Sequence, residues 1–269
     1  MQFETLTEPE WDRVQEAWAA LDSGKLAEAR VTIDRLLAER PGHPDLRMVD
    51  AALLLEAGEA DRALKALAGA EQSADPAAFF HLRGLAEHDL LRFEDALRDA
   101  ERALVIRPDM PESHDLASRT LEHLGKDRES ADHAESAHEL DPEGYPMPLE
   151  ISDEAFDQCV ESSIAELPPE IRKELEEIPV IVDALPIRAM LAAEDPPLAP
   201  DLLGLFIGSP LRDSSFTDEP ALTGAIHLFR RNLLRMCHTP EDLAREIRMT
   251  LQQEVGNLLG LDEDELEDE

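Results

Sequence analysis

The chain has 269 residues, with 61 aspartates and glutamates against 25 lysines and arginines, so its formal net charge is −36. A surface this acidic repels phosphate backbones and anionic lipids, and neither nucleic acid nor a membrane is expected as a partner. With only two cysteines, a disulfide framework is not expected. The chain has no run of 18 apolar residues and starts without a basic or apolar leader, so a cytoplasmic protein is predicted. The Ala- and Leu-rich composition favours packed helices, and the scarcity of lysine suggests a GC-rich bacterial genome.

A repeat organises the first half of the chain. Four prolines close successive segments at intervals of 35, 32 and 34 residues: Pro41, Pro76, Pro108 and Pro142. A turn position recurs inside each segment, at Gly24, Gly58, Leu91 and Gly125. The residue seven before and the residue five after each turn are small: Ala17, Ala51, Gly84 and Ser118 before it, and Ala29, Ala63, Ala96 and Ser130 after it. Because antiparallel helices approach closely only where small side chains cross, four helix pairs are predicted over about residues 8–142.

The segments GKLAEARVTIDRLLAERP and LRFEDALRDAERALVIRP resemble the second halves of tetratricopeptide repeats. The resemblance implies a curved solenoid whose concave face binds a protein or peptide. With the net charge of −36, that partner is expected to be basic. Seven histidines in this half have charged neighbours and no metal-ligand spacing, so they are interpreted as surface residues: His43, His81, His88, His114, His123, His133 and His138.

The helical period stops at DPEGYPMPLEIS, which predicts a linker over residues 144–151 between an array at 1–143 and a second domain at 152–269. Ser152 is a plausible helix cap, and a short helix is expected around 169–176. Apolar runs at 179–182, 202–208 and 224–231 are strand candidates. A last helix should start at Thr239-Pro240 and end at Gly260. The fold class is therefore an all-α array followed by a small α+β domain.

Four segments of this second domain, LPPEIRKELEEIPVIV, LLGLFIGSPL, AIHLFRRNLL and EDLAREIRMTLQQEVGNLLGLDEDEL, together resemble the minimal zincin-like metallopeptidase domain of bacteria. The resemblance runs through residues 153–266. That family carries His-Glu-x-x-His on its last helix, followed by an acidic third zinc ligand. Here the two histidine positions hold Gln253 and Asn257, the acid/base position keeps Glu254, and the third ligand falls on Glu263.

Neutral amide oxygens are poor zinc ligands beside imidazole, so neither zinc nor a catalytic residue is expected. Two alternative metal sites stay open. One is a displaced zinc site that uses His227, His238 or Cys237. The other is an all-oxygen Ca²⁺ or Mg²⁺ site formed by Gln253, Glu254, Asn257 and Glu263.

No phosphate-binding loop and no GxSxG motif is present, and Ser152, Ser162 and Ser163 are expected to cap helices or lie on the surface. The sequence predicts a non-catalytic interaction scaffold that combines the repeats with an inactivated metallopeptidase-like domain and needs no cofactor. Such a domain could still bind an extended chain along a sheet edge. Two alternatives are a metallopeptidase with an atypical metal site and a purely structural adaptor.

Overall fold

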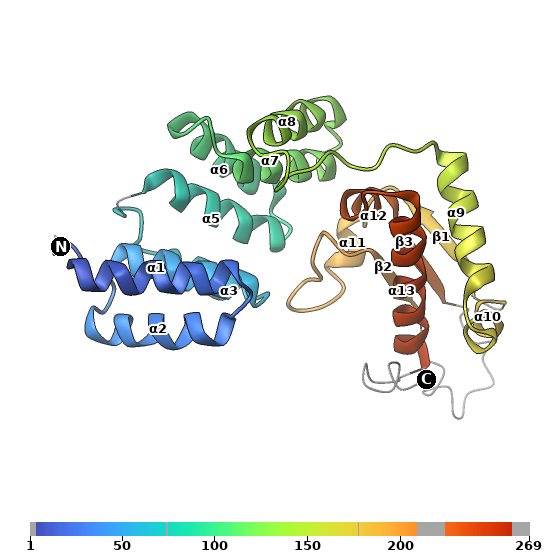
Figure 1. Cartoon of the computed structure of the whole chain (residues 1–269), viewed down its shortest axis with the longest axis horizontal. Helices are drawn as coiled ribbons and strands as arrows, with labels where there is room; N and C mark the ends of the chain where they lie inside the picture. Colours follow the sequence, from blue (N-terminus) through green and yellow to red (C-terminus); the bar gives the residue numbers. More distant parts are fainter. Residues whose placement is uncertain (1–3, 74, 177, 209–223, 260–269) are drawn as a thin grey trace. The chain divides into compact units, whose positions relative to one another are not determined.

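The computed structural model describes residues 4–73, 75–176, 178–208 and 224–259 (Figure 1). Backbone contacts divide the chain into two compact units. One comprises Met1–Tyr145 together with Arg188–Pro200, and the other comprises Pro146–Ile187 with Asp201–Glu269. Within the described residues, no helix is both long and apolar enough to cross a membrane.

The first unit is built from helices that pack in consecutive pairs (Figure 1). The pairs are α1 with α2 (Glu8–Asp22 and Leu26–Glu39), α3 with α4 (Pro44–Glu56 and Ala60–Leu67), α5 with α6 (Pro76–Asp89 and Phe93–Ile106), and α7 with α8 (Pro111–His123 and Asp127–Leu140). The four predicted helix pairs are confirmed. A short helix, α11 (Arg188–Leu191), lies in the second segment of this unit.

The turn inside each pair lies at the position that the spacing predicted and uses the left-handed backbone conformation. The φ angles are +71° at Gly24, +70° at Gly58 and +70° at Gly125, and Leu91 adopts the same conformation at +60°. Leu91 is also buried, so its side chain contributes packing that a glycine could not provide.

The eight small residues at the helix crossings are all buried. Gly84 shows why size matters there. A Cβ atom on Gly84 would lie 3.0 Å from Leu116 Cδ2 and 3.2 Å from the Ala96 carbonyl oxygen. Because one of these neighbours is backbone, a larger residue would push α5 and α6 apart.

The prolines play more varied roles than the repeat spacing suggested. Pro41, Pro108 and Pro142 follow α2, α6 and α8 as predicted, but Pro76 begins α5. Its predecessor Asp75 caps the helix, since the carboxylate accepts a hydrogen bond from the Ala78 amide at 3.0 Å. The α4 helix has already ended at Leu67. Proline suits a first helical turn because the amide it lacks would be unpaired there.

The second unit contains a three-stranded sheet. Its elements are α9 (Asp153–Glu166), α10 (Pro169–Leu175), β1 (Val180–Asp183), β2 (Gly204–Ile207), β3 (Ala225–Phe229), α12 (Arg230–Met236) and α13 (Pro240–Leu259). The strand order is β1-β3-β2, with β1 parallel and β2 antiparallel to β3. Inward residues of β3, Ile226 and Leu228, pack in one core with residues of α9 and α13, so both helices cover the same face of the sheet.

The predicted strands are present, but the second and third are shorter than the predicted ranges 202–208 and 224–231. The chain leaves the sheet after Phe229 and forms α12, where a strand was predicted to continue to residue 231. Burial explains the change, because α12 buries Leu233 and Asn232. The Asn232 side-chain amide donates to the Leu202 carbonyl oxygen at 2.7 Å and so ties α12 to the start of β2.

We expect Gly58→Ala to lower the free energy of unfolding by about 1 kcal/mol, because an alanine is strained in the left-handed conformation. Crowding cannot contribute, since no atom lies within 4 Å of the point that the alanine Cβ would occupy. Gly58→Asn should lose less, because asparagine tolerates this conformation. Urea unfolding of the full chain measures both. An alanine variant as stable as the parent, or an asparagine variant less stable than the alanine one, would contradict the assignment.

Candidate functional site

The α13 helix carries the positions predicted to be degenerate metal ligands, and its buried stripe sets their orientation. Thr239 caps the helix, with Oγ1 accepting from the Asp242 amide at 3.1 Å. Leu243, Ile247, Leu251 and Val255 recur every four residues and are fully buried against the sheet and α9. This stripe places Gln253 and Asn257 together on an exposed face of the helix, while Glu254 points inward.

Glu254 is buried and hydrogen-bonded. Its Oε2 atom accepts from the Phe206 backbone amide of β2 at 2.7 Å, and its exposed fraction is 8%. The side chain of Asn257 provides a second hydrogen bond. Burial raises the pKa of Glu254 above its ordinary value, and the two hydrogen bonds partly oppose that shift. The retained acid/base residue is thus an acceptor that joins α13 to the sheet.

The Phe206 amide lies on the outer edge of the sheet. The Phe229 amide donates to the Leu203 carbonyl, and hydrogen-bonded pairs alternate along antiparallel strands. Residue 206 therefore directs its amide away from β3, toward the side where an added strand would pair. Glu254 already satisfies that donor. Gly204, two residues earlier, permits the close approach of β2 to α13, because a Cβ there would lie 2.5 Å from Thr250 Cγ2.

The donor set at the family's zinc position does not fit zinc. Gln253 and Asn257 offer neutral amides where two imidazoles are needed, and Glu254 is engaged by the Phe206 amide. Glu263, the expected third ligand position, lies outside the described residues. Across the described ranges, no group of three or more His, Cys, Asp or Glu side chains is arranged to bind a metal ion.

The residues considered for a displaced zinc site do not converge in the described part of the chain. His227 is held on β3 by Asp183, with Nδ1 and Oδ2 2.7 Å apart. Cys237 belongs to the hydrophobic core, and burial raises the pKa of its thiol to about 11, which keeps it protonated at neutral pH. His238 is exposed.

The three serines have structural positions. Ser152 caps α9, since its Oγ accepts from the Ala155 amide at 3.2 Å. Ser163 is buried and donates to the Ala244 carbonyl at 3.2 Å, which connects α9 to α13. Ser162 is exposed. The interpretation of Ser152 and Ser162 as cap and surface residues is confirmed, whereas Ser163 is a core contact.

The repeat array contains a groove of about 690 Å³. Its walls come chiefly from α1, α3, α5 and the start of α7, the first helices of the pairs. The apolar part consists of Trp18, Leu21, Ala52, Leu55, Ala78, Leu82, Leu85 and Met110, and the polar part of Glu56, His81, Arg107, Glu112 and Tyr145. Arg107 is ion-paired with Asp75 and also interacts electrostatically with Glu112, so the groove carries two carboxylates, those of Glu56 and Glu112, against this one cation.

The prediction of surface histidines in the array is wrong for His43 and His88, which are buried. The other five histidines are half-buried. His88 Nδ1 lies 3.0 Å from Thr120 Oγ1, and the His123 ring stacks on Phe93 with centroids 4.4 Å apart. Charged neighbours in the sequence hid this burial, because on a helix the residues that share a face are three or four positions apart.

His81 in the groove is neutral at physiological pH. Burial lowers its pKa to about 4, and the positive charge of Arg119 acts in the same direction. The ring is positioned by Ser113, whose Oγ lies 3.1 Å from Nδ1. The groove therefore holds no histidine cation to balance Glu56 and Glu112.

Comparison with known families agrees with both resemblances. A model described as zincin-like metallopeptidase matches residues 175–269, and a tetratricopeptide repeat model matches residues 20–85. The first half of the chain is thus a tetratricopeptide-type array and the second contains a zincin-like domain. No significant match was found among curated protein sequences.

Several solved structures resemble part of the chain. They include the MamA RS-1 ArsTM double mutant, with 21% identity and a TM-score of 0.41 over 51% of this chain and 78% of that one. A MamA structure from Desulfovibrio magneticus RS-1 has 22% identity and a TM-score of 0.42, over 49% of this chain and 76% of that one. MamA MSR-1 has 21% identity and a TM-score of 0.39 over the same shares.

Removing the Glu254 carboxylate should destabilise the second unit. We expect Glu254→Ala to lower the free energy of unfolding by about 1–3 kcal/mol, because the Phe206 amide loses its acceptor. Glu254→Gln should lose less, since its amide oxygen can still accept. Gln253→Ala, on the exposed neighbour, is the matched control and should change stability by no more than about 0.5 kcal/mol.

Chemical denaturation measures the three variants, and hydrogen exchange at the Phe206 amide reports the bond itself. Faster exchange at Phe206 in Glu254→Ala is the expected result. Unchanged exchange there would contradict the structural role of Glu254.

Proposed function

We propose that the protein is a non-catalytic interaction scaffold of the bacterial cytoplasm. In this proposal the tetratricopeptide-type array binds a protein partner, and the zincin-like domain works without metal or cofactor. The observation that carries the proposal is the state of Glu254. A general base must be available to a metal-bound water, but this carboxylate accepts from a backbone amide and lies between Gln253 and Asn257 in the sequence, where the family has histidines.

The groove of the array supports the binding half of the proposal. It combines an apolar wall with the carboxylates of Glu56 and Glu112. Apolar contact provides most of the free energy of binding, and the acidic groups select for cations. We therefore propose a partner segment that presents an apolar side chain flanked by lysine or arginine. The β2 edge is a weaker candidate for chain binding, since Glu254 occupies its Phe206 amide.

Restoring the two imidazoles tests the assignment of the degenerate motif. We expect the double variant Gln253→His, Asn257→His to bind Zn²⁺ far more tightly than the parent, because both positions are exposed and four residues apart on one helix face. Each single variant should gain much less, since one imidazole leaves the site short of ligands. Isothermal titration calorimetry with zinc gives the comparison.

A folded double variant that fails to bind zinc would mean that the motif has been misplaced on α13. Near-stoichiometric zinc in the parent, purified without chelator, would instead contradict the non-catalytic proposal. Chelator-sensitive peptide hydrolysis by the parent would do the same and favour the metallopeptidase alternative.

Charge-led recognition predicts a steep salt dependence. Fluorescent peptides of equal length, with the same central leucine flanked by either lysines or glutamates, serve as probes of the full chain. We expect the lysine peptide to bind more tightly and to weaken as salt rises from about 0.05 M to about 0.5 M, because screening shortens the range of the attraction. Anisotropy measures both affinities.

Glu56→Lys together with Glu112→Lys should reverse the preference between the two peptides. The control is Glu139→Lys, which makes the same change of charge once, on the exposed surface of α8. It should leave the preference between the two peptides nearly unchanged. Equal effects of the groove and control substitutions, after allowing for the number of charges, would contradict binding in the groove.

A further inference from the structure

The last helix of the array packs closely on α7 but buries little apolar surface. Of the residues in α8, only Ser130 and Ala137 are buried. No residue of α8 belongs to the hydrophobic clusters found among the described residues. The contacts between α8 and α7 include two polar side-chain pairs. Ser118 and Ser130 have their hydroxyl oxygens 3.0 Å apart, and His114 and His133 have their Nδ1 atoms 2.9 Å apart.

The histidine contact depends on protonation. His114 Nε2 lies 3.2 Å from the Pro108 carbonyl oxygen, which can only accept, so the neutral ring carries its proton on Nε2. Its Nδ1 then has a free lone pair, and His133 must donate from its own Nδ1. The pair can take up one further proton on His133 Nε2 without losing this bond. A second proton on His114 Nδ1 would turn two donors toward each other at 2.9 Å.

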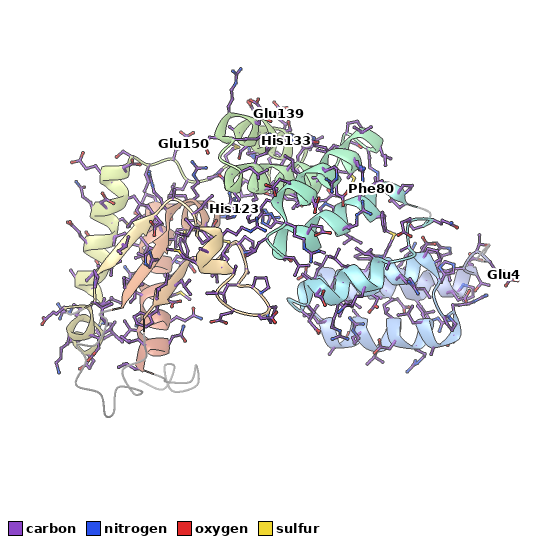
Figure 2. The ribbon with its side chains drawn as sticks, turned by 180° about the vertical axis from the view of Figure 1, so that it is seen from behind. Glu4, Phe80, His123, His133, Glu139 and Glu150 are labelled. Atoms are coloured by element: carbon purple, nitrogen blue, oxygen red, sulfur yellow. The ribbon has the colours of Figure 1, made fainter. Side chains whose placement is uncertain are left out.

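We infer that the His114–His133 pair is a proton-sensitive attachment, through which mild acid makes α8 open from α7 more readily while the rest of the array stays folded. Figure 2 marks His133 on α8. Release separates the two rings, so a second proton on His114 Nδ1 no longer faces another donor. Docked, the pair resists taking up both protons, so opening is coupled to proton uptake and becomes easier as pH falls.

The groups around His133 act in opposing directions. Burial and the neighbouring His114 lower its pKa below the ordinary value. Glu101 of α6 and Glu129 and Asp132 of α8 oppose this shift, and the net direction is downward. Because the docked pKa lies below that of the released helix, the stability of docking is complete above about pH 6.5 and declines as pH falls below it.

Hydrogen exchange on the full chain tests the inference. Peptides that cover α8 are followed at about pH 7.5, 6.5 and 5.5, with rates corrected for intrinsic pH dependence. We expect the opening equilibrium of α8 to rise by up to about tenfold between the two lower values for each proton taken up. Peptides from α2 and α3, which belong to hydrophobic clusters, should show no such change. Protonation of His81 affects α5 only nearer its pKa of about 4.

His133→Asn separates titration from simple loss of contact. The asparagine amide can still donate toward His114 Nδ1 but does not titrate in this range. We expect it to keep α8 docked and to flatten the pH dependence. His138→Asn, one turn further along α8, is the matched control, since it replaces a titratable donor to the Tyr145 carbonyl outside the pair and should leave the pH dependence in place.

Two results would overturn the inference. One is α8 protection that follows α2 and α3 at every pH. The other is an unchanged pH dependence in a folded His133→Asn variant.

Discussion

Close approach between backbone elements is the constraint on which both units depend. In the array, the residues at the helix crossings are no larger than serine, and each is buried. In the second unit, Gly204 has the same role where β2 passes α13, since any side chain would collide with Thr250. The hydrogen bond from Phe206 to Glu254 forms two residues further along the strand, where strand and helix remain close.

Glu254 illustrates how a residue can be retained in a motif while its physical environment changes. In the family motif, two histidines would hold a zinc ion close to this carboxylate. The positive charge of the ion would stabilise the charged form of the carboxylate. Here its neighbours in space are a backbone amide and the amide of Asn257, and burial favours the neutral form. The identity of the residue alone therefore says little about catalysis. The hydrogen-bond partners of its oxygens are more informative, and they are structural.

Much of the fold could be predicted from the sequence because its signals are local. The turns at Gly24, Gly58 and Gly125 and even the non-glycine turn at Leu91 follow from spacing, and so do the cap residues Ser152 and Thr239. Long-range contacts could not be predicted in this way. The α12 helix depends on the bond from Asn232 to the Leu202 carbonyl, and the bond to Glu254 depends on the register of β2.

The burial of the array histidines is a second property that the local sequence does not predict. His88 and His43 are buried by helices distant in the sequence, which neighbouring charges do not reveal. The resemblance to the zincin-like family places the degenerate motif on Gln253, Glu254 and Asn257, and that placement stays a prediction. The burial of Glu254 and the exposure of Gln253 required the helix to be packed against a sheet.

The hydrophilic character of α8 has a consequence for self-association. A stack of helix pairs ends in a helix whose outer side has no following repeat, and an apolar surface there could accept the first repeat of another molecule and grow into a fibre. The outward positions of α8 are instead charged, with Asp127, Glu129, Asp132, Glu135 and Glu139 all exposed. Two such ends repel each other, and an incoming helix would have to desolvate carboxylates without gaining apolar contact. The charged outward side of α8 therefore offers an incoming helix no apolar surface on which a further repeat could stack.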